Sequence, residues 1–180
     1  VIDLYLWEGG GTVPVGIAGV APQETVFGNA RALHLGDNGP YGGVLRPRQD
    51  LCQPVRLFLW NFRQMQLSEL PVPAEVGISA ADGTADGRFA AFVSDADSLD
   101  IGPGNGLDDV FRYDRQTGET VVVSRGTDGG AADGPSGTPS VDAAGQRVCF
   151  VSAAGNLVSP PVSAGTDRLY IREGAGRGSL

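Results

Sequence analysis

An aromatic residue returns at four points along this chain, and the spacing of its copies limits the fold more than any other feature. It stands in a short apolar segment each time, at Tyr5, Phe58, Phe111 and Tyr170. Neighbouring copies are 53, 53 and 59 residues apart. No segment carries a sustained helical period, and turn-forming residues separate the apolar segments. A repeat of this length made from strands predicts the blades of a β-propeller or the coils of a β-solenoid.

The clearest copy of the repeat covers residues 86–118. It opens with an Asp-Gly turn and continues with an apolar run over 89–93, an acidic loop, a strand over 109–113 and a Thr-Gly hairpin turn. The same order returns over 139–152 and 167–172, at offsets of 58 and 59 residues. With an inner and an outer strand added, each unit predicts a four-stranded antiparallel sheet. We therefore expect an all-β chain with blades of a β-propeller type, about three blades plus a partial one.

The predicted blades divide one domain of 180 residues. Their boundaries are a partial blade at 1–19 and blades at 20–72, 73–130 and 131–180. The sequence begins with Val, and blades are cut at both ends, which favours a piece of a longer propeller. Assembly with another chain and an open stack of blades remain as alternatives.

Within the blades, individual strands are assigned by alignment. Residues 29–35 take the place of 86–92 at an offset of 57, so His34 falls in the second strand of its blade as a structural residue. Residues 36–53 then form a long loop. Residues 76–79 are expected to be the innermost strand of the 73–130 blade.

Composition limits the partners of the chain. The formal net charge is −8, and the 13 basic residues are all Arg. No basic stripe is present to neutralise phosphates, so we expect no nucleic-acid partner. No apolar stretch reaches the length of a transmembrane helix, so no direct membrane span is expected.

Four segments carry a resemblance to a known family: residues 86–94, 108–118, 153–158 and 167–172. They are similar to the TolB-like, WD40-like β-propeller repeat of bacterial proteins. The match is good over roughly residues 74–173 and is confined to the strands over 1–72. The resemblance implies four-stranded blades and an extracytoplasmic location, either periplasmic or secreted. It implies little about function, because this fold serves many roles.

The acidic loop of the 73–130 blade is the candidate metal site. Its oxygen-bearing side chains are those of Asp95, Asp97, Asp100, Asn105 and Asp108. Hard cations such as Ca²⁺ take six to eight oxygen ligands, which these side chains and the neighbouring backbone carbonyls can supply. The spacing is not that of an EF-hand. A solvated acidic loop with Asx-type turns is the structural alternative, and no other cofactor is expected.

Other residues have structural interpretations. Cys149 lies in an apolar strand, where a buried free thiol is favoured over a bridge to Cys52. Trp7, Trp60 and Tyr113 share one repeat position, which favours packing between blades over a ligand platform. No Gly-x-Ser-x-Gly elbow, Cys/His cluster or phosphate-binding glycine motif is present. We therefore expect no catalytic residues and no enzyme activity.

These features favour a non-enzymatic propeller scaffold that binds a protein partner or associates with itself, as in an accessory subunit of a larger assembly. One alternative is the propeller portion of a hydrolase or of a glycan-processing enzyme. In that case residues 78–79 and 140–142 would face the central channel, where they offer little chemistry. A second alternative is a surface or adhesion repeat protein stabilised by Ca²⁺.

Overall fold

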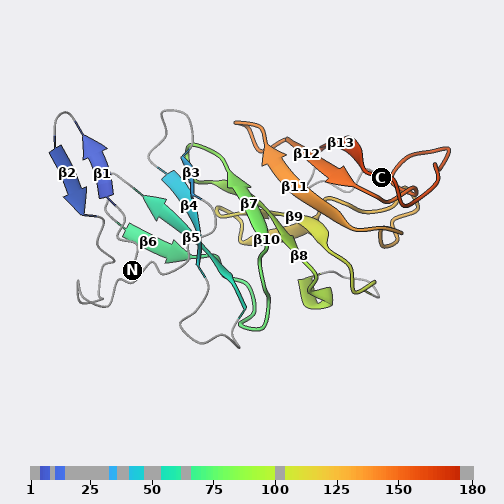
Figure 1. The fold of residues 1–180 in the computed structure, drawn as a ribbon, viewed down its shortest axis with the longest axis horizontal. Coiled ribbons are helices and arrows are strands. Elements are labelled where there is room, and N and C mark those ends of the chain that lie inside the picture. Colours follow the sequence, from blue (N-terminus) through green and yellow to red (C-terminus); the bar gives the residue numbers. More distant parts are fainter. Residues whose placement is uncertain are drawn as a thin grey trace.

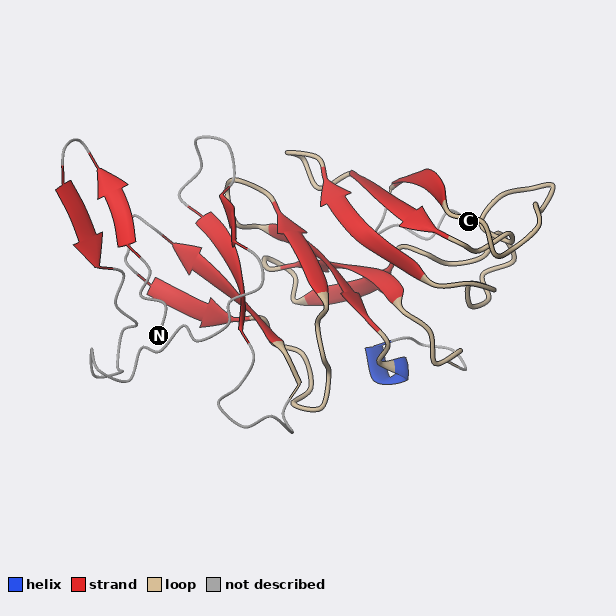
Figure 2. Ribbon diagram, viewed as in Figure 1, coloured by secondary structure: helices blue, strands red, loops and turns tan. Residues whose placement is uncertain are grey.

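The computed structural model describes residues 5–8, 11–14, 33–35, 41–46, 54–61, 66–99 and 104–174. Its strands form a hairpin and three antiparallel sheets, which follow one another along the molecule (Figure 1). The only helical turn in these residues is the three-residue η1 (Figure 2). The expected all-β fold with antiparallel, propeller-type blades is confirmed.

The strands have the following bounds. The hairpin is β1 (Tyr5–Glu8) and β2 (Gly11–Pro14). The first sheet is β3 (Leu33–Leu35), β4 (Tyr41–Arg46), β5 (Arg56–Asn61) and β6 (Gln66–Glu69). The second sheet is β7 (Ala80–Gly83), β8 (Phe89–Ser94), β9 (Asp109–Asp114) and β10 (Glu119–Val122), with η1 (Asp97–Leu99) between β8 and β9. The third is β11 (Ser136–Val141), β12 (Arg147–Ser152) and β13 (Arg168–Glu173).

The register of the second and third sheets reproduces the sequence repeat. Phe92 lies opposite Phe111, and Phe150 lies opposite Tyr170. Both pairs are stacked, with ring centroids 5.5 Å and 5.8 Å apart. Such a pair contributes about 0.5–1.5 kcal/mol beyond the burial of its apolar area. The aligned aromatics are therefore cross-strand partners that fix the register of each sheet.

Alternate residues of the second sheet pack against different neighbours, because successive side chains of a strand point to opposite faces. Phe92, Phe111 and Tyr113 join Leu57 and Leu59 of the first sheet in one core cluster. The expected packing role is confirmed for Tyr113. The side chains of Trp7 and Trp60 lie outside the described part.

The opposite face of the second sheet packs on the third. Val93 and Val110 share a second core cluster with Val148, Phe150 and, from the loop beyond β12, Leu157. The second sheet contributes to both clusters, so it is the middle layer of the stack and is buried on both faces. The continuous apolar run of β8 predicted this burial.

The turns before β8 and β12 have one geometry. Gly87 has a φ of 68° and its N–H donates to the Thr84 carbonyl at 2.8 Å. Gly145 has a φ of 67° and donates in the same way to Asp142 at 2.9 Å. Glycine takes this left-handed conformation without the steric cost that a Cβ brings. The Asp-Gly signal therefore marks a repeated turn, which the third sheet keeps although Ala144 replaces the Asp.

Two strand assignments in the first sheet were wrong. β3, which holds His34, is the innermost strand of the first sheet and not the second. The second strand, which corresponds to β8 of the second sheet, is β4, and it lies within residues 36–53, which were expected to form a loop. Gly42 and Gly43 suggested a turn there. In the structure these glycines pair with Trp60 and Leu59 of β5, so ladder pairing overrides their turn preference.

The innermost strand of the second sheet was also misplaced, because it is β7 and not residues 76–79. Residues 76–79 instead connect the first sheet to the second. The N–H of Ile78 donates to the Val55 carbonyl at 2.9 Å, and the N–H of Ser79 donates to Val93 at 3.1 Å. Val76 and Ile78 are buried in the core between the first two sheets. Their apolar alternation reflects this burial.

Cys149 is a free thiol in β12 and is half-buried, whereas Cys52 lies outside the described residues. The blade boundaries at 19, 72 and 130 stay a prediction. Among the described residues, no helix has the length and apolar character that a membrane span requires.

Candidate functional site

Four chain segments meet at one end of the first and second sheets because of where their strands begin and end. Val55 directly precedes β5, Ser79 precedes β7 and Asp108 precedes β9. Asp95 directly follows β8. Since neighbouring strands are antiparallel, the end of β8 lies beside the starts of β7 and β9. The topology thus gathers polar residues that are distant in the sequence.

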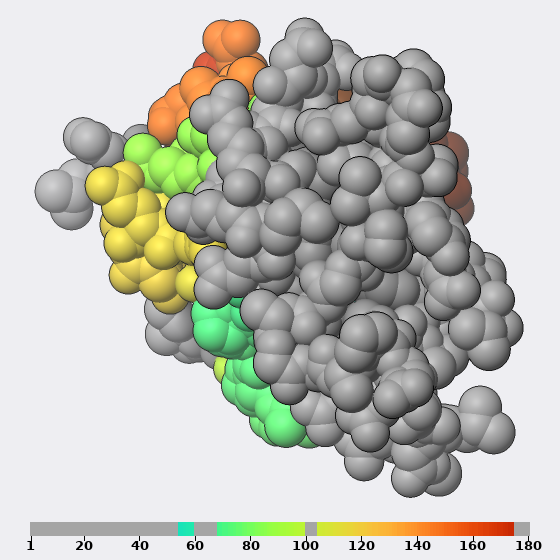
Figure 3. Space-filling view, turned by 90° about the vertical axis from the view of Figure 1, so that its left-hand side faces the viewer, coloured from blue at the N-terminus to red at the C-terminus, as the bar shows by residue number. Residues whose placement is uncertain are grey.

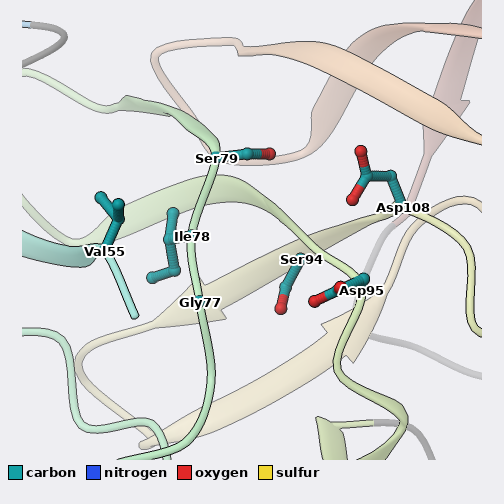
Figure 4. Close-up of a pocket in the computed structure, with 7 residues that line it drawn as sticks. All are labelled: Val55, Gly77, Ile78, Ser79, Ser94, Asp95 and Asp108. Atoms are coloured by element: carbon teal, nitrogen blue, oxygen red, sulfur yellow. The ribbon is translucent and has the colours of Figure 1, made fainter. Parts of the chain in front are cut away.

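These segments enclose a cleft of about 220 Å³. It is lined by Val55, Gly77, Ile78, Ser79, Ser94, Asp95 and Asp108 (Figure 4). Ile78 and Ser94 are buried, whereas Ser79, Asp95 and Asp108 are exposed. The cleft therefore combines the apolar side chains of Val55 and Ile78 with exposed polar residues that include two carboxylates.

The polar lining residues Ser79, Asp95 and Asp108 reach the surface of the molecule, since all three are exposed. In the space-filling view from the hairpin end, the yellow and green atoms of the second sheet and its loops lie next to one another (Figure 3). Pockets for small organic ligands usually measure about 300–1,000 Å³. The cleft is smaller than that, so a single side chain is a better match for its size than a whole cofactor.

Hydrogen bonds within the loop between β8 and β9 and to Ala132 hold its described residues, 95–99 and 104–108. Asn105 Nδ2 donates to the Ala132 carbonyl at 2.8 Å, and its Oδ1 accepts from the N–H of Leu107 at 2.9 Å. Asp97 Oδ1 accepts from the N–H of Gly106 at 3.3 Å. One predicted metal ligand, Asn105, thus makes an Asx-type turn of the structural alternative, and a second, Asp97, accepts a longer-range bond within the same loop.

The structure places four of the five predicted ligands. Asp95 and Asp108 share the cleft described above, whereas Asp97, with Asp95, borders a smaller cavity of about 10 Å³. Asp100 lies outside the described residues. Within the described ranges, no three His, Cys, Asp or Glu side chains are grouped so that they could hold a metal ion. Calcium binding by the full set stays a prediction.

The shifted titratable groups lie at the other end of the second sheet. Arg88 donates to both carboxylate oxygens of Asp114, at 3.2 Å and 2.9 Å, which lowers the pKa of Asp114 and raises that of Arg88. The pKa of Asp86 is lowered too: partial burial raises it, but hydrogen bonds from the Thr84 hydroxyl and the Arg88 N–H outweigh that effect. Burial lowers the pKa of Arg112. These groups belong to a structural network.

Sequence reasoning missed Val55 and Ser94 as site residues. Ser94 closes the apolar run of β8, and a serine directly before an acidic loop is a signal that could have found it. Val55 comes from another sheet, and no local pattern links it to Asp95.

Comparisons with known proteins identify the fold. No family profile and no curated protein matches the sequence. Among solved structures, TolB from Acinetobacter baumannii aligns with a TM-score of 0.52 and 15% identity, over 82% of this chain and 30% of that one. A putative TolB from Agrobacterium tumefaciens aligns with a TM-score of 0.51 and 11% identity, over 81% of this chain and 44% of that one. The tricorn protease aligns with a TM-score of 0.48 and 16% identity, over 72% of this chain and 11% of the protease.

Both TolB chains are far longer than the part that this chain spans. The likeness to them agrees with the antiparallel sheets and with the repeated register. The chain therefore has a TolB-like β-propeller fold.

Proposed function

We propose that the chain is the propeller part of a non-enzymatic extracytoplasmic binding protein, whose cleft receives a cationic side chain of a polypeptide partner. The observation that carries the proposal is the cleft itself, whose lining combines the carboxylates of Asp95 and Asp108 with the apolar side chains of Val55 and Ile78. An arginine or lysine side chain combines an apolar stem with a charged head, and this cleft complements both parts.

The charge of the cleft supports this choice of ligand. Within the part that the structure describes, no arginine forms an ion pair with Asp95 or with Asp108. The formal charge of the whole chain is −8, which attracts cationic partners and raises their rate of association. Ser79 and Ser94 add hydroxyl groups that can accept hydrogen bonds from a guanidinium.

A set of blocked tetrapeptides that differ at one central residue tests the proposal. Titration calorimetry at low salt compares Arg with its neutral isostere citrulline and with Glu. We expect the Arg peptide to bind about five- to tenfold more tightly than the citrulline peptide, as partly exposed ion pairs allow. Equal affinity for the Arg and Glu peptides would contradict the proposal.

Variants assign the binding to the cleft. The Asp95→Asn/Asp108→Asn double variant should lose the preference for Arg. Asp128→Asn/Asp167→Asn removes the same net charge from exposed positions outside the cleft and is the matched control. If both double variants lose the preference equally, the cleft is not the site.

Location and lack of catalysis belong to the same proposal. The extracytoplasmic location is supported by the resemblance to bacterial propeller repeats, and fractionation of cells that make the native protein tests it.

The seven residues that line the cleft include no His or Cys that could serve as base or thiol nucleophile. The alternative of a hydrolase or glycan-processing enzyme instead predicts a catalytic domain in the same reading frame.

A further inference from the structure

In the third sheet, one carbonyl oxygen bonds to two donors at the end of β12. The Pro135 carbonyl accepts from the N–H of Ala153 at 2.9 Å and from the hydroxyl of Ser152 at 3.0 Å. The oxygen of Ser152 also accepts from the N–H of Ala154 at 3.0 Å, which fixes the turn that follows the strand. These bonds join the segment before β11 directly to the end of β12.

The second sheet has the same two donors, but no carbonyl of the described residues is bonded to them. Ser94, Asp95 and Ala96 stand 58 residues before their counterparts in the third sheet. The N–H of Ala96 donates to Ser94 Oγ at 3.2 Å, so the turn after β8 repeats the turn after β12. Ser94 is only 2% exposed, yet its hydroxyl donates to no described residue, and neither does the N–H of Asp95. Both residues line the cleft, so the two donors are available to a ligand there.

The carbonyl that would complete this contact in the second sheet belongs to Gly77, the counterpart of Pro135. It accepts no hydrogen bond from the described residues. The next residue explains the difference, because Ser136 donates its hydroxyl to the end of β12 at 2.8 Å, whereas Ile78 has no hydroxyl and packs in the core shared with the first sheet. The segment of Gly77 therefore stays apart from the end of β8, and the cleft lies between them (Figure 4).

We propose that the hydroxyl of Ser94 and the N–H of Asp95 bind a main-chain carbonyl oxygen of the polypeptide partner. The third sheet provides the precedent within this chain, since one peptide carbonyl satisfies both equivalent donors there. The nature of the partner rests on the proposed function, whereas the carbonyl contact is independent of the partner's charge. Affinity for the peptide backbone and preference for a cationic side chain are therefore separate properties of one cleft.

The charge of the cleft selects a neutral oxygen for these donors. Asp95 and Asp108 carry carboxylates in the same lining, and neither forms an ion pair within the described part of the chain. These carboxylates would repel a carboxylate or phosphate oxygen of a ligand. A peptide carbonyl is a strong acceptor without net charge, so it fits the site.

The carbonyl of Gly77 gives the partner's backbone a second contact. The N–H and the C=O of a planar trans peptide group point in opposite directions. One such group, placed across the cleft, can therefore accept from Ser94 and Asp95 on one side and donate to Gly77 on the other. An extended segment offers these groups without breaking bonds of its own, as when a peptide adds to the edge of a sheet.

Amide NMR of the isotope-labelled chain tests the contact, with the blocked Arg and citrulline tetrapeptides as probes. We expect the amide proton of Asp95 to shift downfield with both peptides, because its N–H gains an acceptor. The amide of Ala153 already has one and should keep its position, so it is the matched control. An Asp95 amide that neither peptide moves would overturn the proposal. So would exchange of this amide in the free chain as slow as that of Ala153, since the donor would then be bonded already.

Ser94→Ala removes one of the two donors. It should weaken binding of the Arg and citrulline peptides alike, by about two- to tenfold, and leave the ratio of the two affinities as in the parent. Ser152→Ala removes the equivalent buried hydroxyl of the third sheet and should leave both affinities unchanged. The amide spectrum shows whether each variant is folded. Unchanged affinity in Ser94→Ala would contradict the carbonyl contact.

The two proposals for the cleft can fail separately. If the Arg and Glu peptides bind equally but both move the amide of Asp95, the preference for a cation is wrong and the carbonyl contact stands. If the preference for Arg holds but the amide of Asp95 does not move, the cleft binds the side chain alone and the carbonyl contact is wrong.

Discussion

At Gly145 the chain turns directly against the ring of Phe89 in the neighbouring sheet. A Cβ at this position would lie 2.1 Å from Cδ2 of Phe89, and the φ of 67° adds strain for any other residue. Arg112 packs on the same ring, 4.9 Å from its centroid, and donates to the Gly145 carbonyl at 2.7 Å. One turn thus connects two sheets through a ring, a guanidinium and a carbonyl.

We expect Gly145→Ala to lower the free energy of unfolding by about 2–4 kcal/mol, because overpacking adds to backbone strain. Gly118→Ala is the matched control. Its φ is 75° but no atom lies within 4 Å of the added Cβ, so it should lose only about 1 kcal/mol. Urea unfolding measures both variants, and equal losses would show that the contact with Phe89 is unimportant.

The bidentate pair of Arg88 and Asp114 makes stability depend on pH. Hydrogen bonding to Arg88 holds the pKa of Asp114 below its ordinary value in the folded state. A carboxylate with a lowered folded pKa stabilises the protein above its unfolded pKa, near 4, and this contribution is lost as pH falls through the folded pKa. Acid should therefore weaken the fold at this end of the second sheet.

Asp114→Asn should cost about 1 kcal/mol at pH 7, since the Arg88 side of the pair is partly exposed. Its stability should also fall less steeply than that of the parent between about pH 4 and pH 2. Asp167→Asn removes a charge from an exposed loop and controls for net charge. Unfolding midpoints across this range provide the test, and identical slopes for the Asp114 variant and the parent would refute the expectation.

Between elements, one carboxylate ties the innermost strands of two sheets together. Asp82 of β7 accepts from the N–H of Val141 at 2.9 Å and from the hydroxyl of Ser140 at 3.1 Å, both on β11. Backbone groups of neighbouring innermost strands do not form a common ladder here, because β7 and β11 belong to different sheets. A side chain therefore supplies the acceptor that the Val141 N–H needs.

Asp82→Ala should destabilise the protein by about 1–3 kcal/mol, because a half-buried N–H loses its acceptor. Hydrogen exchange at the Val141 amide should become faster in this variant. Ser140→Ala keeps the acceptor and should leave that exchange rate close to the parent's. Unchanged protection of Val141 in Asp82→Ala would mean that another group satisfies the amide.

The loop between β8 and β9 is the element that the calcium prediction concerns. That prediction expects a heat of binding when Ca²⁺ is added, and a higher unfolding midpoint, because a ligand that binds the folded state stabilises it. The Asp95→Ala/Asp97→Ala/Asp100→Ala variant should show neither effect. No heat in the parent chain would end the prediction.

The sequence predicted some elements well for identifiable reasons. Phe92 with Phe111 and Phe150 with Tyr170 are cross-strand pairs, so aligning the aromatics also aligned the strands. The prediction failed at β4 because the pairing of Gly42 and Gly43 with β5 is a long-range contact that local preference cannot show. It was partial at the cleft, since Asp95 and Asp108 were found but Val55 reaches them only through the packing of two sheets.

At the scale of the whole molecule, each sheet packs mainly on the sheets next to it in the sequence. The two core clusters lie between successive sheets, and the second sheet contributes to both. Stability in such a stack is close to a sum of terms for units and for their nearest-neighbour interfaces. The recurring aromatic was therefore a reliable guide to architecture, whereas most carboxylates of the loop between β8 and β9 have no counterpart in the repeat at 153–167.

The equal turns before β8 and β12 also make the chain extensible. Gly87 and Gly145 have matching φ values and lie 58 residues apart. A second copy of residues 84–141, inserted after Val141, would therefore enter and leave the fold at equivalent points of this turn. The insertion would add one complete sheet, and each new junction would join the same two kinds of face that already meet in the parent. The turn geometry thus permits lengthening of the chain by tandem duplication. Such duplication gives a route to engineered chains with more blades.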